Sequence, residues 1–456
     1  MTGDPAGVRL LRLPVGRLER NARVVAAAKL INVGLAMLWG FAVTFTFVRL
    51  LPIAEFRAFL LLVAFANFTV SADFGFSGII YARLRRFRLG GAQAGGAEAG
   101  GDFHPRDMAV LLAFMMAVVV LGAVLIAGGI ATGHIPTQRP GLFLAFYILS
   151  AANIFAILVK RAMAALDHNL LWELVDAVRR TLSVALLLLA LAGVPVILSV
   201  CIQIALVAAA LLYGLSVIHG ASGMAPGDWL LRGVAWGRVR RSYMADMGTT
   251  MALTLSDVAA YTAPYFGIAM MTHDPRPLLI FDFIFKISRA LSALVRALSE
   301  AVLPRLTAAF HEGRMQRVRE IARRLLWGAL AAAGALALGL MLAGPMLSRL
   351  LFDGKAVLTL AELVALAMLL CGLAVLCVST YVHNGVGAFA RLLPPSLVFL
   401  ALSVGSVVAA AGLARVLGEP FALCFASLYA LSHAVLGLWH WRMLGRLTGP
   451  VRKMPA

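Results

Sequence analysis

The chain has 456 residues, of which 62% are apolar and 13% charged, and its net charge is +19. A soluble protein carries about a quarter of its residues as Asp, Glu, Lys and Arg, so this composition excludes a soluble enzyme. If one bilayer crossing takes about 20 apolar residues, twelve crossings use about 240 and leave no room for a sizeable aqueous domain.

Apolar stretches follow one another along the chain in the manner of an all-α polytopic membrane protein. Six occupy about 27–48, 58–80, 108–131, 142–159, 181–194 and 195–217. Six more occupy about 243–271, 278–303, 325–347, 357–382, 392–414 and 420–441. The fifth must extend back over Leu170 to Val178 to reach the length of a crossing. We expect about 12 transmembrane helices in two six-helix bundles, residues 1–218 and 241–456, around a central cavity.

The basic residues alternate between the two sides of the predicted helices. With the N-terminus inside, the inner segments hold 29 of the 40 Lys and Arg residues, and the outer loops hold 7. Positive residues concentrate on the cytoplasmic side of membrane proteins. This pattern predicts a cytoplasmic N-terminus and C-terminus. It indicates that the basic residues interact with membrane lipids and not with nucleic acid. Arg outnumbers Lys 35 to 5, which is typical of a GC-rich bacterial genome.

Two inner segments differ from the short loops elsewhere. The segment Leu89 to Phe103 contains GGAQAGGAEAGG and predicts a flexible linker. Residues 219–240 combine Trp229 and Trp236 with several arginines. Aromatic groups beside arginines favour a short helix at the level of the lipid headgroups, which would join the two bundles as a cytoplasmic interfacial linker.

The eighth apolar stretch, FDFIFKISRALSALVRALSEAVLP, holds the most ionisable residues: Asp282, Lys286, Arg289, Arg296 and Glu300. On a helix they share an arc of about 80° and extend over about 27 Å, so this charged stripe cannot face lipid. In one interpretation, Asp282 with Lys286 and Arg296 with Glu300 form a buried ladder of ion pairs. In the interpretation that we favour, the stripe lines a hydrated cavity, and its net charge of +1 suits an anionic cargo.

Other stretches carry single carboxylates. Asp257 shares a helical face of about 60° with Asp246, Thr250 and Tyr261. Asp246 would lie at the inner interface, whereas Asp257 lies about three turns deeper and is the better functional candidate. Asp73, in the tetrad Asp-Phe-Gly-Phe, has two interpretations: a functional carboxylate, or one that is bonded to neighbouring backbone.

Charges near the ends of predicted helices have simpler interpretations. We expect Lys29 to reach the inner surface as a structural residue. A further set is expected to form a solvated helix end: Glu173, Asp176, Arg179 and Arg180.

The sequence contains no P-loop, no CxxC pair, no HExxH and no GxSxG motif. The four cysteines lie inside apolar runs, where they are expected to pack as small apolar residues. We therefore expect no cofactor, no metal site and no enzymatic activity.

Two segments resemble a known family. The segment VTFTFVRLLPIAEFRAFLLLVAFANF, followed by ADFGFSGIIYARLRR, resembles the opening of the polysaccharide branch of the multidrug/oligosaccharidyl-lipid/polysaccharide (MOP) exporter superfamily. The segment FDFIFKISRALSALVRALSEAVLPRLTAAFHEGR resembles the eighth helix of that family and the inner loop after it. The resemblance implies a flippase that moves an anionic polyprenyl-diphosphate-linked oligosaccharide across the inner membrane by alternating access, for cell-surface polysaccharide biosynthesis. Cationic cavity residues meet the diphosphate and the sugar in such proteins, and the matching positions here are Lys286, Arg289 and Arg296.

Three other functions stay open. A cation-coupled multidrug exporter of the same superfamily would want an acidic cavity and an acidic residue in the first helix, and Ala27 to Val48 contains none. A membrane glycosyltransferase or polymerase would need a substantial outer loop. The third alternative is a protein that transports nothing and acts as a partner of polysaccharide polymerases or glycosyltransferases. For a transporter, we expect a coupling or gating role for Asp73, Asp257, Asp282 and Glu300, with proton, sodium or membrane potential as the driving force.

Overall fold

The computed structural model describes residues 19, 21–90, 105–222, 226–229 and 233–448, and every element in them is a helix. The predicted linker from Leu89 to Phe103 lies almost wholly outside the described residues. The first part of the chain forms α2 (Ala22–Leu50), α3 (Ile53–Ser71), α4 (Phe76–Gly90), α5 (Pro105–Ala131), α6 (Pro140–Ala151), α7 (Asn153–Ala165), α8 (Asn169–Leu191) and α9 (Val196–Ser222). The second part forms η1 (Pro226–Trp229), α10 (Gly233–Met271), α11 (Arg276–His311), α12 (Met315–Leu351), α13 (Leu360–Gly385), η2 (Phe389–Arg391), α14 (Leu393–Leu417) and α15 (Phe421–Thr448).

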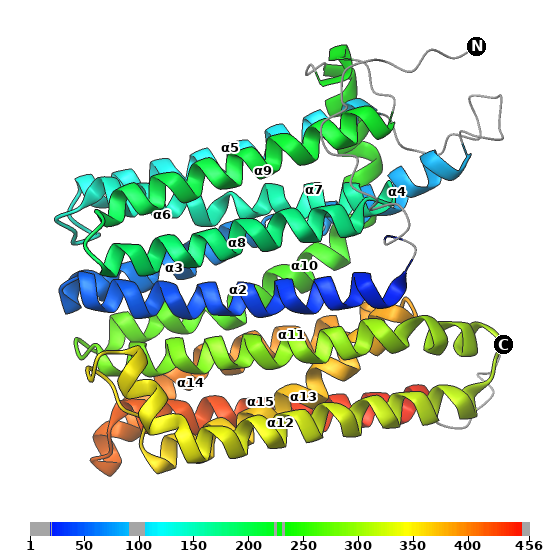
Figure 1. The fold of residues 1–456 in the computed structure, drawn as a ribbon. Coiled ribbons are helices and arrows are strands. Elements are labelled where there is room, and N and C mark those ends of the chain that lie inside the picture. The colour runs from blue at the N-terminus through cyan, green and yellow to red at the C-terminus, as the bar shows by residue number, and fades with distance from the viewer. Residues whose placement is uncertain (1–18, 20, 91–104, 223–225, 230–232, 449–456) are drawn as a thin grey trace.

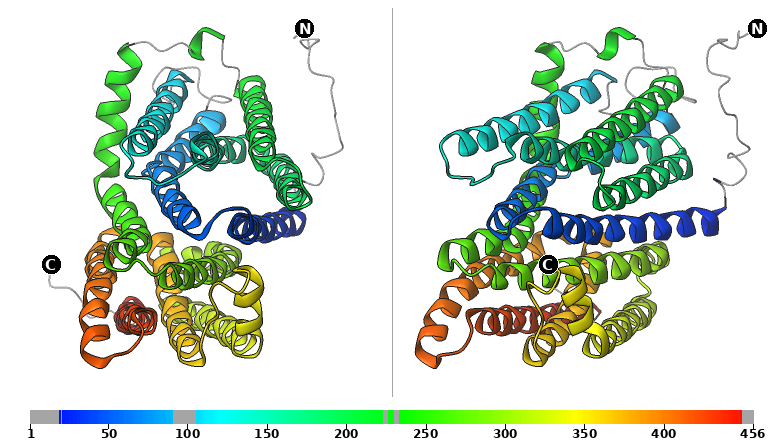
Figure 2. Two further views of the ribbon diagram at one scale, coloured as in Figure 1. Left: turned by 90° about the vertical axis from the view of Figure 1, so that its left-hand side faces the viewer. Right: turned by 60° about the vertical axis from the view of Figure 1, so that its left-hand side comes forward.

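The helices run side by side in two groups (Figure 1). Helices α2 to α9 lie in the upper part of Figure 1 and α11 to α15 in the lower part. Viewed along the helices, α10 passes down one side and connects the two groups (Figure 2). It packs on α14 of the lower group and on α3 of the upper group, while α2 packs against α8 and α11. The contacts of α2 and α10 therefore define the boundary between the groups.

Nine helical segments of the described residues are long and apolar enough to cross a membrane. They are Val24–Leu50, Ile53–Arg85, Arg106–Ala131, Pro140–Ala165, Val196–Ser222, Met315–Leu351, Leu360–Gly385, Leu393–Leu417 and Phe421–Arg446. Leu, Val and Met side chains are exposed along many of these helices, as expected for surfaces that face lipid. The prediction of an all-α polytopic membrane protein is confirmed.

Helix boundaries follow from familiar local chemistry. The hydroxyl of Thr359 caps the start of α13 by accepting from the Glu362 amide, and the Glu362 carboxylate accepts from the Thr359 amide. Helix α14 ends at Gly418, whose φ of 69° suits a residue without Cβ. At the fifth apolar stretch, α8 begins at Asn169, so the expected extension back over Leu170 is present.

Two segments differ from the sequence-based expectation. Residues 233–240 belong to the long helix α10 and do not form a separate short helix before it. The second apolar stretch divides into α3 and α4, because Phe74 and Gly75 take positive φ angles of 47° and 87°. The Asp-Phe-Gly-Phe tetrad is therefore a break between two helices.

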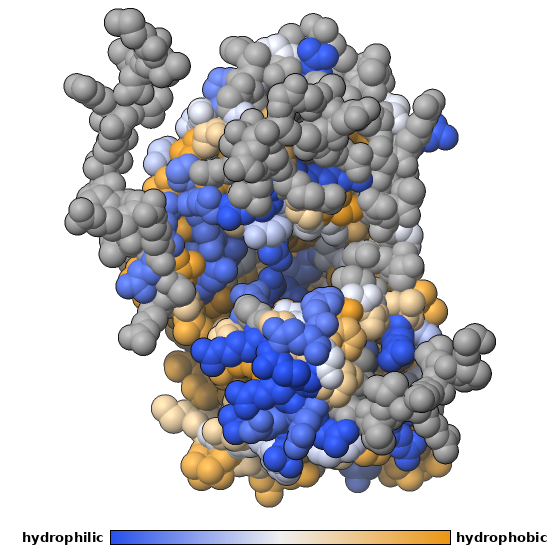
Figure 3. Space-filling model, turned by 90° about the vertical axis from the view of Figure 1, so that its right-hand side faces the viewer, coloured by the Kyte–Doolittle hydropathy of each residue, from blue (hydrophilic) through white to orange (hydrophobic). Residues whose placement is uncertain are grey.

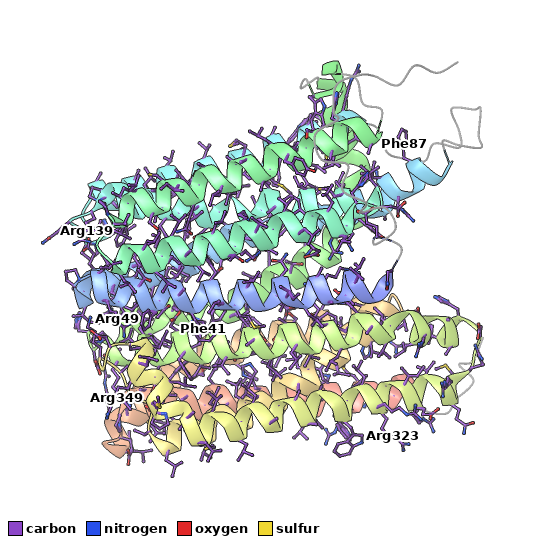
Figure 4. The ribbon with its side chains drawn as sticks, viewed as in Figure 1. Phe41, Arg49, Phe87, Arg139, Arg323 and Arg349 are labelled. Atoms are coloured by element: carbon purple, nitrogen blue, oxygen red, sulfur yellow. The ribbon has the colours of Figure 1, made fainter. Side chains whose placement is uncertain are left out.

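The two ends of the molecule carry different elements (Figure 4). Arg49, Arg139 and Arg349 lie at one end, which we call the Arg349 end. Phe87 and Arg323 lie at the opposite end, which we call the Arg323 end.

Candidate functional site

The predicted charged stripe lies on α11, and its first member, Asp282, is buried where α11 meets α2 and α10. Its Oδ2 accepts a hydrogen bond from the Thr44 hydroxyl at 3.1 Å, and its Oδ1 accepts one from the Tyr265 hydroxyl at 3.0 Å. Lys286, one turn along α11, forms an ion pair with the same carboxylate. Because Thr44 belongs to α2, Asp282 connects the lower group of helices to the upper one.

The remaining charges of the stripe are exposed. Arg296 and Glu300 form an ion pair at 2.9 Å, and their side chains are 50% and 44% exposed. Both ion pairs that the spacing allowed are thus present. Arg289 lies between the two pairs, with its guanidinium 5.7 Å from the centroid of the Phe285 ring, and pairs with no described carboxylate. The stripe is therefore not a closed ladder of ion pairs.

A recess opens between the two groups at the Arg323 end. Figure 3 shows this end hollowed between the upper and lower helices, with hydrophilic residues inside the hollow. Lys29 of α2 and Arg161 of α7 lie within electrostatic range of Glu300, and Arg161 also lies within range of Arg296. Neither Lys29 nor Arg161 forms an ion pair or hydrogen bond with another described residue. Unpaired charges are costly in lipid, so we expect both side chains to reach water.

A cavity of about 270 Å³ lies between α10, α11, α13 and α14, and residues of α3 and α15 complete its lining. Asp257, Arg289 and Tyr381 line it. The Oδ1 atom of Asp257 accepts a hydrogen bond from the Ser396 hydroxyl. Tyr381 lies within electrostatic range of both Arg289 and Arg296, which places the cavity next to the exposed half of the stripe.

The charges expected to form a solvated end of α8 are instead buried, and that prediction is wrong. Glu173, Asp176 and Arg179 are 1%, 4% and 8% exposed. The Asn32 amide of α2 donates to Glu173 Oε2 and Asp176 Oδ2, each at 2.8 Å, and Lys160 of α7 pairs with Glu173 at 2.8 Å. Arg179 and Arg180 both pair with Asp176. This network joins α2, α7 and α8, so these charges hold the upper group together.

Asp73 caps the start of α4. It accepts hydrogen bonds from the Ser77 amide at 3.1 Å and from the Ser77 hydroxyl at 2.7 Å. Arg161 lies within its electrostatic range. Of the two sequence interpretations, the bonded carboxylate accounts for these contacts, and a gating role for Asp73 stays a prediction.

At the Arg349 end, cations of one group donate to main-chain carbonyls of the other. Arg49 of α2 donates to the carbonyls of Leu350 at 2.6 Å and Leu351 at 3.4 Å, in the last turn of α12. In the reverse direction, Lys355 donates to the carbonyl of Val48 in the last turn of α2. Helix C-termini leave carbonyls without partners and attract cations. These contacts bring the groups together at this end.

A second set of such contacts joins α3 to α10. The Arg57 guanidinium donates to the carbonyls of His273 at 2.8 Å, Ala269 and Thr272, at the end of α10. The Arg349 end is therefore closed by bonds between the groups, whereas the Arg323 end is hollowed.

The structure brings together Arg289, Arg296 and Glu300 from the predicted site, and places Asp257 in the adjoining cavity. Asp282 and Lys286 lie apart from them in a buried contact. The side chains of Asp246 and Thr250 lie outside the described residues. Arg161 and Lys29 were not predicted to belong to the site. Arg161 follows Lys160 at the end of an apolar run, where such a pair indicates only the cytoplasmic side. Among the described residues, no group of three His, Cys, Asp or Glu could hold a metal ion.

No family model and no curated protein sequence matches the chain. Solved structures do match. A MATE transporter in complex with MaL6 has a TM-score of 0.60 at 12% identity, over 93% of this chain and 95% of that one. A mutant of the Vibrio cholerae MATE transporter VcmN has a TM-score of 0.60 at 13% identity, over 95% and 97%. A MOP superfamily transporter from Pyrococcus furiosus has a TM-score of 0.53 at 11% identity, over 93% and 96%.

Each of these structural matches extends over nearly the full length of this chain and of the matched chain. The chain is a multi-pass membrane protein with the fold of the MATE transporters of the MOP superfamily.

Proposed function

We propose that the protein is a non-enzymatic membrane transporter of the MOP superfamily, with twelve crossings in two six-helix bundles around a central cavity. The nine apolar segments account for nine crossings. Helices α8, α10 and α11 account for the other three, since at 23, 39 and 36 residues each is long enough to span a bilayer. Residues 1–218 form one bundle, residues 219–240 the connection and residues 241–456 the other bundle.

The Arg323 end is the cytoplasmic side in this proposal. The exposed side chains of Arg314, Arg317 and Arg324 lie at this end, at or near the start of α12. The positive-inside rule assigns such clusters to the cytoplasm of a bacterial inner membrane. The structure then corresponds to an inward-open state, because the recess opens at this end and the Arg349 end is closed.

The proposed cargo is a polyprenyl-diphosphate-linked oligosaccharide, flipped from the inner to the outer leaflet by alternating access. One observation carries this proposal: Lys29 of α2 and Arg161 of α7 have no ion-pair partner among the described residues, and both lie within electrostatic range of Glu300, the partner of Arg296. Fixed cations with several donors suit a diphosphate. The Pyrococcus furiosus neighbour is described as having a reverse polarity of its binding pocket that suggests a different function. The cationic recess is consistent with such a divergence.

The alternative is a multidrug exporter, because the neighbours include transporters described as multidrug resistance MATE family members. A cavity for organic cations would need an excess of carboxylates. Asp257 and Glu300 are available here, but Glu300 is paired with Arg296. Helix α2, the first apolar segment of the described residues, contains no acidic residue.

For coupling, we propose that carboxylates exchange partners during the cycle. A diphosphate that binds Arg296 would displace Glu300, and the contact of Asp282 with Thr44 must break when the bundles separate. Asp257, whose one hydrogen-bond partner among the described residues is Ser396, is the third candidate, and Asp73 is the fourth. A proton or a sodium ion would be the exchanged ion.

A leaflet assay on the purified protein in vesicles tests the function. It follows a fluorescent polyprenyl-diphosphate-linked sugar in wild type, Arg161→Ala and Arg296→Ala. Charge-assisted hydrogen bonds contribute about 1.5–3 kcal/mol, so each substitution should lower the apparent affinity about 10- to 150-fold. Arg323→Ala is the control, since this exposed arginine lies on the outer side of α12, away from the recess.

Equal transport by all four proteins would refute the diphosphate assignment. If the vesicles instead accumulate a cationic dye, and Asp257→Asn abolishes that accumulation, the multidrug alternative is correct.

A further inference from the structure

The cavity between α10, α11, α13 and α14 differs from the recess in charge. Three cations, Lys29, Arg161 and Arg296, lie within electrostatic range of Glu300. The other carboxylates in range of these cations, Asp73 and Glu173, are already bonded to other residues. The cavity holds one guanidinium, Arg289, and one carboxylate, Asp257, so their charges cancel. The cavity is therefore built for a neutral group, whereas the recess suits an anion.

Several hydroxyls that line the cavity are already bonded within their own helices. Thr262 donates to the carbonyl of Val258 at 2.7 Å, and Ser288 donates to that of Ile284 at 2.7 Å. These groups are not available as donors to a ligand.

Other polar groups in the same lining have no hydrogen-bond partner among the described residues. They are the hydroxyls of Thr380 and Tyr381, the side-chain amide of Asn67 and the Nδ1 atom of His440. His440 is only 3% exposed, so its ring nitrogen is buried without a partner. A buried polar atom without a hydrogen bond is costly, and this cost falls when a ligand supplies the bond. Both donors and acceptors are free, which suits a ligand with many hydroxyl groups.

Aromatic rings supply the remaining surface. Phe285 and Phe399 line the cavity, and the rings of Tyr261 and Phe399 lie 5.1 Å apart at 72° to each other. Rings at such an angle present apolar surface in two directions, against which the C–H faces of a sugar ring can pack. The volume of about 270 Å³ is just below the usual range of ligand pockets, which begins at about 300 Å³. It suits one ring and not an oligosaccharide.

The spacing along α11 fits a cargo whose first sugar is attached directly to a diphosphate. Arg289 and Arg296 are about two turns apart, or about 10.5 Å along the helix axis. A diphosphate at Arg296 would therefore place the adjoining sugar at Arg289.

We propose that this cavity is a monosaccharide subsite, which binds the sugar next to the diphosphate through Thr380, Tyr381, Asp257 and Arg289. This inference rests on the proposed function and adds a site that selects the first sugar of the cargo.

The test compares two probes on the full-length protein in detergent: a polyprenyl diphosphate without sugar, and the same lipid with one N-acetylhexosamine. Affinities are measured from the ligand-induced rise in the thermal unfolding midpoint. Wild type should bind the sugar-bearing lipid at least about tenfold more tightly, since several neutral hydrogen bonds are gained. Thr380→Val should reduce this preference about three- to tenfold and leave the affinity for the bare lipid unchanged.

Thr262→Val is the matched control, because it removes the same hydroxyl from a lining threonine that already bonds Val258. The subsite is refuted if wild type binds both lipids equally, or if the two threonine variants lose the preference alike. If neither lipid raises the unfolding midpoint of wild type, the proposed function itself fails. If the bare lipid binds and the sugar adds nothing, only the subsite fails.

Discussion

The closure of the Arg349 end makes a quantitative prediction about the transport cycle. Arg57 of α3 donates to three carbonyls at the end of α10, those of Ala269, Thr272 and His273. A movement that separates α3 from α10 at this end must break all three. Arg57→Ala removes the bonds in the closed state only, so it should favour the state that is open at the Arg349 end.

The size of the shift follows from the exposure of the side chain. A hydrogen bond from a charged donor contributes about 1.5–3 kcal/mol. Because the Arg57 side chain is partly exposed, water can replace much of the hydrogen bonding that the substitution removes. We therefore take about 1.5–2 kcal/mol as the total contribution of the Arg57 side chain to the closed state. Since 1.4 kcal/mol corresponds to a factor of ten, the population of the open state should rise about 10- to 30-fold.

Cys377 provides the assay, because this buried residue lines the cavity. In a protein whose other three cysteines are replaced, a membrane-impermeant maleimide is added to the side that the Arg349 end faces. Labelling of Cys377 should be faster in Arg57→Ala by the same factor. Arg139→Ala is the matched control, since Arg139 also donates to a helix-terminal carbonyl, Leu50, but within the upper group. Equal labelling of the two variants would refute the reasoning.

Two further predictions concern the buried contacts. Gly372→Ala would place a Cβ 2.4 Å from the carbonyl oxygen of His433 and force α13 away from α15, so the unfolding midpoint should fall; Gly34→Ala, which meets nothing within 4 Å, should raise it slightly. Asp282→Asn leaves the Lys286 ammonium without its partner and should cost about 3–5 kcal/mol in the free energy of unfolding, of which the double variant Asp282→Asn, Lys286→Met should recover most. Chemical denaturation in detergent measures each, and a double variant as unstable as the single one would contradict the pairing argument.

The stripe on α11 shows what helical periodicity can predict. The common face of Asp282, Arg289 and Arg296 follows from 100° per residue, and both ion pairs four residues apart are formed. Periodicity assigns side chains to a face, but it does not tell which neighbour covers each turn. The structure places α2 and α10 against Asp282 and leaves Arg296 in the recess.

The network around Glu173 and Asp176 shows where the sequence was misleading. Charges at the start of a helix are usually solvated, and here the partners that bury them come from other helices. Asn32 is 141 residues from Glu173 in the chain, so no local pattern connects the two. The same reason accounts for the missed role of Arg161, whose neighbours in the recess belong to α4 and α11.

The closure at the Arg349 end could not be predicted for a different reason. Arg49 and Lys355 bond main-chain carbonyls, which every residue possesses, so the sequence contains no partner residue to find. Carboxylates can be matched to cations by type, whereas helix-terminal carbonyls are matched only by position.

The three long helices that fall outside the nine apolar segments also carry many of the buried or site-lining charges. Helices α8, α10 and α11 carry the buried network, Asp257 and the charged stripe. A charged residue lowers the mean hydropathy of the helix that carries it. A helix that lines a polar site is therefore less apolar than a helix that faces lipid. The nine apolar segments, in contrast, expose Leu and Val to lipid. A low hydropathy in a long helix of such a protein therefore indicates charges that are buried in protein or hydrated, and for this chain two of the three such helices, α10 and α11, carry the candidate site.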